Sequence, residues 1–251
     1  MVRTLLVRGM LVGMVAGLVS FGFLKLYGEP QLDRALAFET QLEGATAAAE
    51  KAGASASDAH EHELVSRPVQ AGIGLLTGVV VYCTAFGGLF GLAFAFAYGR
   101  VGGSLTPQAM SALLAATGFV VVALVPSLKY PASPPTVGDP ETIGLRTALY
   151  FVMIAVSIAA ALAAASLKRA LLPRLGDWNA TLIAAGAYAV LAVLAAFALP
   201  TIDEVPGEFP AAVLWQFRIA SIGAQVIMWT TIGLLFGMLA QRDDRRSLNG
   251  R

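Results

Sequence analysis

The stretch KYPASPPTVGDPET, residues 129–142, interrupts an otherwise apolar part of the chain. It holds four of the twelve prolines, so neither a continuous helix nor a central strand can run through it. Strongly apolar runs lie on both sides, at residues 112–125 and 148–167. Lipid cannot satisfy the amide groups of irregular backbone, so the stretch must lie at a membrane surface or line a wet cavity walled by protein. It is therefore either a rigid external connector or part of a site.

The composition indicates a polytopic membrane protein. Of the 251 residues, 57% are hydrophobic and 13% are charged, whereas a soluble domain has about 25% charged residues. The single cysteine, Cys83, excludes a disulfide within the chain, and among glycine and alanine it is expected to be a small packing residue. No basic tract with interleaved aromatic residues is present, so we expect no nucleic-acid partner.

The apolar runs predict an all-α integral membrane helix bundle that forms a single membrane domain over residues 1–251. About six runs are long enough to span a bilayer, namely residues 5–26, 71–98, 108–125, 147–167, 180–199 and 211–239. No small-x-small cleavage site follows the first run, so we expect it to be kept as a span rather than removed as a signal peptide. The polar segments between the spans are an acidic loop at 27–70, a Pro-rich loop at 126–146 and an acidic loop at 200–210.

Glycine spacing predicts close helix packing. Gly9, Gly13 and Gly17 recur every fourth residue, which places them on one helix face, and the second run repeats this spacing. The pairs in the second run are Gly74 with Gly78 and Gly87 with Gly91. Within the first polar loop, residues 31–51 have the spacing of a helix.

The charges predict the orientation of the chain in the membrane. Six spans put both termini on one side, which carries ten Lys and Arg residues against six on the other. The positive-inside rule then places the N- and C-termini in the cytoplasm. Thirteen of the sixteen Asp and Glu residues face outward in this orientation. Such a surface attracts cations, although exposed loops also need acidic residues for solubility, and both interpretations stay open.

Both histidines stand in one polar run, DAHEHE, at residues 58–63. Imidazole and carboxylate together suit borderline divalent ions such as Co²⁺, Ni²⁺ or Zn²⁺. In an extended backbone, alternate residues point the same way, so the two imidazoles could share an ion. A solvated loop without metal is the alternative. The candidate metal ligands are Asp58, His60, Glu61, His62 and Glu63.

The apolar runs contain no Asp, Glu or His away from their ends. A haem held by histidines within the membrane is therefore excluded, and a carboxylate proton relay is disfavoured. Hydroxyls and amides such as that of Gln225 are what the spans offer a cation. Arg218 either snorkels to the outer surface or pairs with an outward carboxylate. The candidate pathway or mouth residues are Glu29, Lys129, Tyr130, Asp139, Glu141, Asp203, Glu204, Glu208, Arg218 and Gln225.

Two outer segments carry a resemblance to a known family. LKYPASPPTVGDPETIGLR at 128–146 and LPTIDEVPGEFPAAVLWQFRIAS at 199–221, together with the glycine-rich first run, resemble the CbtA family of probable cobalt transporter subunits. The resemblance implies a multi-pass protein of the bacterial inner (cytoplasmic) membrane that acts in cobalt uptake tied to cobalamin biosynthesis. It also implies a small single-span partner with a His-rich end, CbtB.

We therefore predict a subunit of a transporter for a divalent transition-metal cation, with cobalt as its cargo and no bound cofactor. The alternative is a non-transporting membrane scaffold that assembles a partner complex, because abundant glycine and alanine also suit helix packing. An enzyme is disfavoured, since the chain lacks a phosphate loop, a nucleophile elbow and a Cys-x-x-Cys pair. Membrane lipid is the remaining expected partner.

Overall fold

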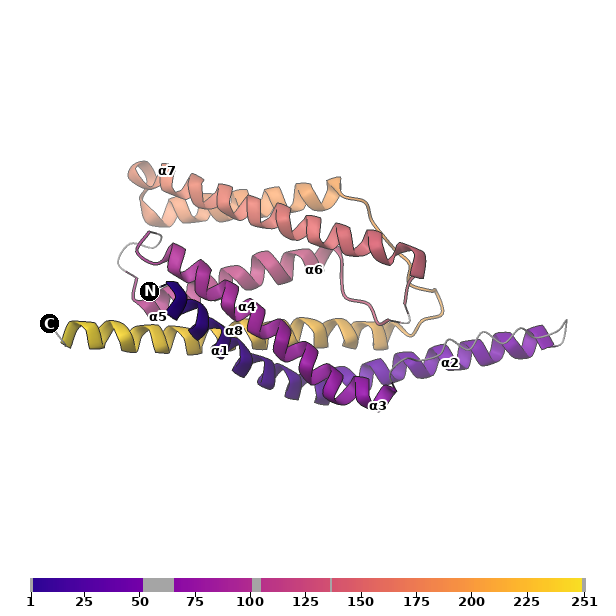
Figure 1. Ribbon diagram of the computed structural model, residues 1–251. Coiled ribbons are helices and arrows are strands. Elements are labelled where there is room, and N and C mark those ends of the chain that lie inside the picture. The colour runs from indigo at the N-terminus through magenta and orange to yellow at the C-terminus, as the bar shows by residue number, and fades with distance from the viewer. Residues whose placement is uncertain (1, 52–65, 101–104, 136, 250–251) are drawn as a thin grey trace. The chain divides into compact units, whose positions relative to one another are not determined.

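A computed structural model describes residues 2–51, 66–100, 105–135 and 137–249. The regular secondary structure of these residues is helical, and no strand occurs among them. In chain order the helical elements are α1 (Val2–Phe23), η1 (Leu24–Gly28), α2 (Glu29–Lys51), α3 (Arg67–Val69), η2 (Gln70–Gly74), α4 (Leu75–Ala97), α5 (Pro107–Gly118), η3 (Phe119–Leu124), α6 (Val125–Lys129), η4 (Pro140–Thr142), α7 (Ile143–Ala198) and α8 (Ala211–Asn249) (Figure 1).

Five continuous helical stretches of the described chain are long and apolar enough to cross a membrane: Val2–Leu42, Arg67–Ala97, Pro107–Lys129, Ile143–Ala198 and Ala211–Arg242. The fourth is broken at Gly176, whose φ of 73° and ψ of 170° are not helical. The predicted spans 147–167 and 180–199 lie on either side of that break. The prediction of an all-α membrane helix bundle is confirmed.

Two helices continue through a proline that stands just after a widened turn. Pro30 and Pro126 each follow a widened, π-helical turn, η1 and η3 respectively. A proline has no N–H to donate, and its ring meets the carbonyl group four residues earlier. A wider turn moves that carbonyl aside and lets the helix go on. The third helix therefore runs to Lys129 rather than ending at residue 125, the predicted limit.

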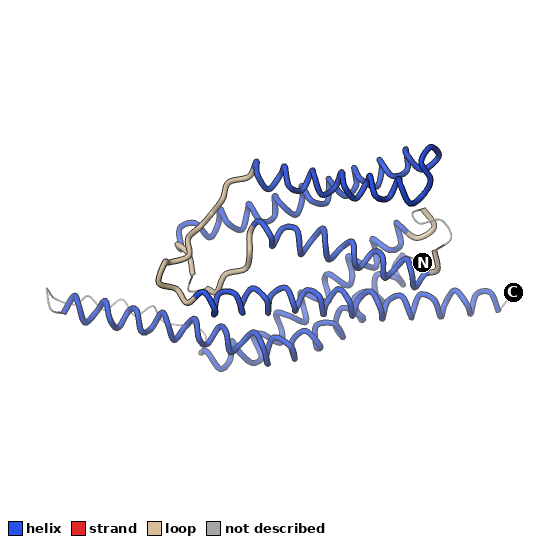
Figure 2. Tube along the Cα trace, turned by 180° about the vertical axis from the view of Figure 1, so that it is seen from behind, coloured by secondary structure: helices blue, strands red, loops and turns tan. Residues whose placement is uncertain are grey.

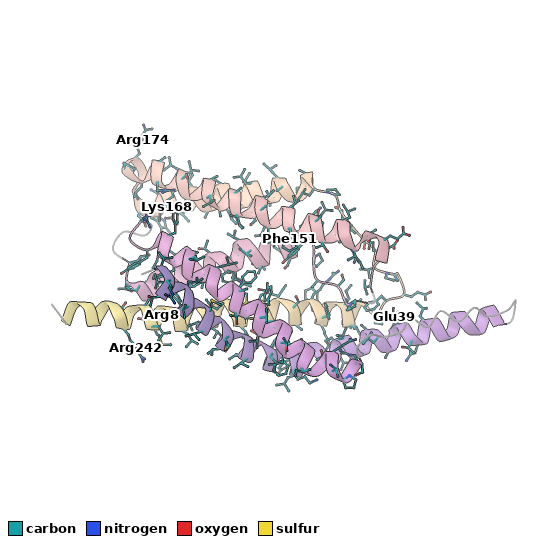
Figure 3. The ribbon with its side chains drawn as sticks, in the orientation of Figure 1. Arg8, Glu39, Phe151, Lys168, Arg174 and Arg242 are labelled. Carbon is teal, nitrogen blue, oxygen red and sulfur yellow. The ribbon has the colours of Figure 1, made fainter. Side chains whose placement is uncertain are left out.

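The chain forms two compact units, and we describe each by itself. Unit 1 comprises Met1–Ala116 and Glu208–Arg251, and unit 2 comprises Thr117–Gly207. Within unit 1, α1 begins and α8 ends toward the same end, as both views show (Figures 1 and 2). Arg8 and Arg242 lie toward that end and Glu39 toward the other (Figure 3). This separation agrees with the predicted charge asymmetry, while the side of the membrane stays a prediction.

The core of unit 1 is the contact of α1 with α4. A Cβ atom added at Gly13 would meet the Cys83 carbonyl oxygen and lie 2.9 Å from the Thr84 Cα. Gly9 similarly faces Gly87 and Gly91, so the predicted close packing is confirmed for these glycines. The prediction of close packing is wrong for Gly74 and Gly78. These two glycines have the same spacing, but neither packs closely against another helix. The structure leaves open space around Gly78, and Gly74 approaches only its own helix at Val69.

Unit 2 is dominated by a helical hairpin. The two arms of α7 run out and back from the turn at Gly176 (Figures 1 and 2). The hydroxyl groups of Ser157 and Tyr188, one on each arm, share a hydrogen bond of 2.9 Å. Large apolar side chains face outward, as Phe151 does with 63% of its surface exposed (Figure 3). Small residues inside and large apolar residues outside are typical of a helix pair surrounded by lipid.

Candidate functional site

A cavity of about 320 Å³ lies within unit 1, between the end of α1, η1, the start of α2, α4 and α8. Two of the predicted pathway residues, Glu29 and Gln225, line it although they are far apart in the sequence. Its wall is mostly apolar, as expected for a cavity between membrane-spanning helices. The hydroxyl-bearing residues Ser20, Tyr82 and Ser221 add polar groups to it. The cavity is therefore the place where the described spans offer a cation both a carboxylate and neutral oxygen ligands.

The carboxylate of Glu29 is almost fully buried, with 8% of the residue exposed. It accepts a hydrogen bond of 2.6 Å from Nη2 of Arg67, and the same nitrogen donates to Asp33 Oδ1 at 2.9 Å. A buried carboxylate needs such a partner, because removing it from water without one is costly. One guanidinium group here opposes two carboxylates, so the three side chains together carry a net negative charge. This favours the approach of a cation.

Gln225 is held by a neighbour on α4. Its amide nitrogen donates to the hydroxyl oxygen of Tyr82 at 3.2 Å. Because the amide N–H group is used in this way, the amide carbonyl oxygen is the atom left to accept a hydrogen bond or to bind a cation. Gln225 is thus a residue of the cavity wall whose carbonyl oxygen can serve as a ligand.

Two sulfur atoms also reach this cavity, and the sequence did not identify either as functional. Cys83 is 2% exposed and Met228 is 1% exposed, and both line the wall. Cys83 was expected to be a packing residue, which its burial beside Gly17 also satisfies. No sequence signal links Cys83 to Ser20 or Met228, because α1, α4 and α8 meet only in the fold.

Among the described residues, no three His, Cys, Asp or Glu side chains come together to hold a metal ion. The cavity accordingly offers one carboxylate and one thiol beside neutral oxygen and thioether groups. Few protein ligands suit an ion that keeps part of its water shell and must leave again. The predicted ligands Asp58, His60, Glu61, His62 and Glu63 lie outside the described residues.

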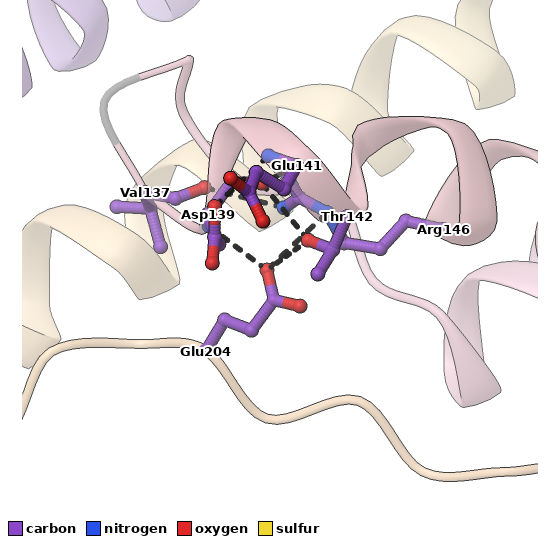
Figure 4. Close-up of polar contacts among 6 residues, drawn as sticks. All are labelled: Val137, Asp139, Glu141, Thr142, Arg146 and Glu204. Atoms are coloured by element: carbon purple, nitrogen blue, oxygen red, sulfur yellow. Dashed lines mark hydrogen bonds and ion pairs between the residues drawn. The ribbon is translucent and has the colours of Figure 1, made fainter.

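A second polar cluster, the loop clamp, joins the Pro-rich loop to the loop after α7 within unit 2 (Figure 4). It consists of Asp139, Thr142, Arg146 and Glu204. Oε2 of Glu204 accepts hydrogen bonds from the backbone N–H of Asp139 at 3.0 Å and from the Thr142 hydroxyl at 2.8 Å. It also forms an ion pair of 3.4 Å with Nε of Arg146. This oxygen of Glu204 is therefore engaged in holding the two loops together.

The backbone of the Pro-rich loop is shaped around the same arginine. Gly138 has a φ of +112°, and a Cβ atom there would overlap the Arg146 guanidinium group. Arg146 Nη1 donates to the carbonyl oxygen of Val137 at 3.3 Å. Asp139 Oδ1 in turn accepts from the backbone N–H of Glu141 at 2.9 Å. The loop is folded on itself by these contacts, as a rigid connector requires.

Two predicted mouth residues brace the loops further. Lys129 Nζ donates to Thr201 Oγ1 at 3.0 Å, and the Tyr130 hydroxyl donates to the carbonyl oxygen of Pro200 at 2.7 Å. Burial raises the pKa of the Tyr130 phenol above its ordinary value. The phenol therefore stays neutral and able to donate over the physiological pH range.

The remaining predicted residues lie elsewhere. Asp203, in unit 2, and Glu208, in unit 1, are exposed on the segment before α8. Arg218 is partly buried on α8 and makes an interaction there. The structure thus brings Glu29 and Gln225 to one cavity and Lys129, Tyr130, Asp139, Glu141 and Glu204 to the joined loops of unit 2.

Comparison with known proteins gives the family. The CbtA family, described as a probable cobalt transporter subunit, matches residues 2–241. No curated protein and no solved structure matches the chain. The helices long enough to span a membrane fit a multi-pass membrane protein. A transporter subunit works with a partner in a complex, and it does not belong to a class of enzymes. The chain belongs to the CbtA family of probable cobalt transporter subunits.

Proposed function

We propose that this chain is the subunit that conducts Co²⁺ inward across the bacterial inner membrane, in support of cobalamin biosynthesis. The observation that carries the proposal is the cavity of unit 1, which Glu29 and Gln225 both line between membrane-spanning helices. Cobalt is the cargo here, and no resident cofactor is needed. The cytoplasmic placement of both termini belongs to the same proposal.

The charges near Glu29 suit the capture of a cation. Arg67 is shared between Glu29 and Asp33, which keeps the buried carboxylate in place while leaving the group net negative. An arriving divalent ion competes with the guanidinium group for the Glu29 oxygens. The ion then moves along the cavity, where the Gln225 carbonyl and the Ser221 hydroxyl replace some of its water ligands.

The first outer loop has its own role in this proposal. Asp58, His60, Glu61, His62 and Glu63 collect cations outside the membrane and raise their concentration near the cavity. Replacing His60 and His62 by Ala together should then lower cobalt uptake at low external cobalt and have little effect at saturating cobalt. A double change of Ser55 and Ser57 to Ala is the matched control in the same loop. Equal uptake by both variants at low cobalt would leave this segment without a role in capture.

A small His-rich single-span partner of the CbtB type completes the proposed transporter. The predicted spans of this chain contain no His. Such a partner would add the borderline nitrogen ligands that Co²⁺ favours. Uptake should therefore be larger when both proteins are expressed together than when this chain is expressed alone.

The test of the cavity compares two carboxylates that share one arginine. Glu29→Gln removes the charge that lines the cavity, whereas Asp33→Asn removes the neighbouring charge, whose side chain is 62% exposed. Uptake of radioactive cobalt, normalised to the amount of chain in the membrane, should fall strongly for Glu29→Gln and only slightly for Asp33→Asn. Equal effects of the two changes would argue against passage through the cavity.

The scaffold is the second candidate, favoured by the close packing of α1 on α4 through Gly9, Gly13 and Gly17. A scaffold would be needed for the partner to accumulate in the membrane but would not itself change cobalt flux once the partner is present. Loss of uptake in Glu29→Gln at normal partner levels would favour transport over scaffolding.

A further inference from the structure

A buried hydroxyl group without a well-formed hydrogen bond lines the cavity of unit 1. Ser20 is 2% exposed, and its Oγ has no hydrogen-bond partner of adequate geometry. A buried polar group left in this way costs about 1–3 kcal/mol, so its presence calls for an explanation. A helical serine usually bonds to the carbonyl oxygen of the preceding turn. Ser20 instead lies beside the Cys83 thiol, which is only a weak partner.

Close backbone contact sets this pair of side chains. A Cβ atom at Gly17, one turn before Ser20, would lie 2.7 Å from the Val80 Cα and 3.3 Å from the Cys83 Cβ. Only a glycine lets α1 approach α4 closely enough at this point. The approach places the Ser20 oxygen and the Cys83 sulfur on the same wall of the cavity, with the Met228 thioether lining it from α8.

We infer that Cys83 and Ser20 form a binding point for a divalent transition-metal cation inside this cavity. The inference rests on the proposed function, because it names the place where the transported ion is held. Thiolate and thioether sulfur are soft ligands that favour transition metals over Mg²⁺ and Ca²⁺, which prefer oxygen. The Ser20 hydroxyl oxygen then gains a stronger partner than the Cys83 thiol.

The binding step is an exchange of a proton for a metal ion. The S–H bond of Cys83 breaks, a bond forms between its sulfur and the cation, and the proton passes to a water molecule. No electron is transferred, and the metal keeps its oxidation state. The Ser20 oxygen and the Met228 sulfur bind as neutral ligands, and water fills the remaining positions. Because a proton is released, binding should strengthen as pH rises.

The lone cysteine makes this step measurable. Cys83 is the single cysteine of the chain, so a small thiol reagent such as methyl methanethiosulfonate modifies this site alone. The full chain would be treated in its membranes, and the modified fraction measured from the mass of the intact chain after purification. With Co²⁺ about tenfold above its dissociation constant, modification should slow about tenfold. Mg²⁺ at the same concentration should leave the rate unchanged.

Two serine variants sharpen the test. Ser20→Ala keeps the thiol and removes the oxygen ligand, so protection should need a higher Co²⁺ concentration than in the wild type. Ser111→Ala is the control, because Ser111 is equally buried but donates to the carbonyl oxygen of Gly233 and does not line the cavity. It should be protected like the wild type. Protection by Co²⁺ no better than by Mg²⁺, or no modification without metal, would overturn the inference.

Cobalt uptake separates this inference from the proposed function. If the wild type takes up cobalt but Co²⁺ does not protect Cys83 from modification, the proposal of transport is retained and the binding point is rejected. If Co²⁺ protects Cys83 but the chain gives no cobalt uptake with its partner, the binding point is retained and the proposal of transport is rejected. Uptake that falls in Cys83→Ser while the amount of chain in the membrane is unchanged would support both.

Discussion

The carboxylate of Glu204 accepts a hydrogen bond of 3.0 Å from the backbone N–H of Asp139, and this bond joins the loop before α7 to the loop after it (Figure 4). A carboxylate that accepts from a backbone N–H and a hydroxyl while facing a guanidinium group forms strong, charge-assisted bonds. Glu204 was predicted among the residues of a cation mouth. Its contacts also give Glu204 a structural role, because they join the two loops that lead into and out of the α7 hairpin.

Removing the Glu204 charge should loosen these loops. Glu204→Gln loses the ion pair with Arg146 and should lower the free energy of unfolding by about 1–3 kcal/mol. Asp203→Asn is the matched control, since Asp203 is an exposed neighbour. Thermal unfolding of the purified chain in detergent, followed by circular dichroism, measures the difference. A loss that is no larger for Glu204→Gln than for Asp203→Asn would contradict the clamp.

Gly138 should not tolerate a side chain. Gly138→Ala places a Cβ atom on backbone with a φ of +112° and into the Arg146 guanidinium group, so we expect a loss of more than about 1 kcal/mol. Gly207→Ala is the control in the other loop, because a Cβ atom there meets nothing within 4 Å. Limited proteolysis of membranes should cut the Pro-rich loop faster in Gly138→Ala. Equal cutting rates in the two variants would count against the described loop conformation.

The packing of α1 on α4 should depend on which glycine is changed. Gly13→Ala brings a Cβ atom onto the backbone of Cys83 and Thr84, whereas Gly22→Ala on the same helix meets nothing within 4 Å. Backbone cannot move aside as a flexible side chain can, so Gly13→Ala should destabilise by about 1–3 kcal/mol. Gly22→Ala should be neutral or stabilising. The temperature at which each variant loses its helical signal in detergent tests this order.

Tyr130 should contribute stability that depends on pH. Its pKa is raised by burial, so the fold favours the neutral phenol, which donates to Pro200. That contribution is fully present below the unfolded pKa of about 10 and is lost as pH rises through the higher folded value. Tyr130→Phe should therefore be less stable by about 1 kcal/mol at neutral pH. Denaturant unfolding at neutral and at strongly alkaline pH should show this difference shrink. A constant difference would contradict the prediction.

Much of the fold could be predicted because its elements depend on local patterns. The apolar runs placed the spans, and the four-residue spacing of Gly9, Gly13 and Gly17 predicted a packing face on α1. The same spacing failed at Gly74 and Gly78, since spacing identifies a helix face but not whether another helix covers it. The sequence pattern also could not predict that the helix continues from Val2 to Leu42, because the π-helical turn before Pro30 has no clear sequence signal.

The candidate site was predictable only in part. Glu29 and Gln225 could be named one at a time, as a carboxylate and an amide near apolar runs. That they line one cavity follows from the packing of helices far apart in the chain, which no local pattern encodes. Cys83 was missed for a related reason. A lone cysteine among small residues has the pattern of a packing residue, and its place beside Ser20 appears only when α1 meets α4.

The most direct test of the account is cobalt uptake by two glutamine variants of α8. Gln225 lines the cavity, whereas Gln216 lies on the same helix, accepts a hydrogen bond from Arg34 and does not line it. Cells expressing the chain with its single-span partner would be given radioactive cobalt, with uptake normalised to the chain in the membrane. We predict a roughly tenfold fall for Gln225→Leu, equivalent to about 1.4 kcal/mol, and little change for Gln216→Leu. Equal uptake by Gln225→Leu and the wild type would contradict passage of the ion through this cavity.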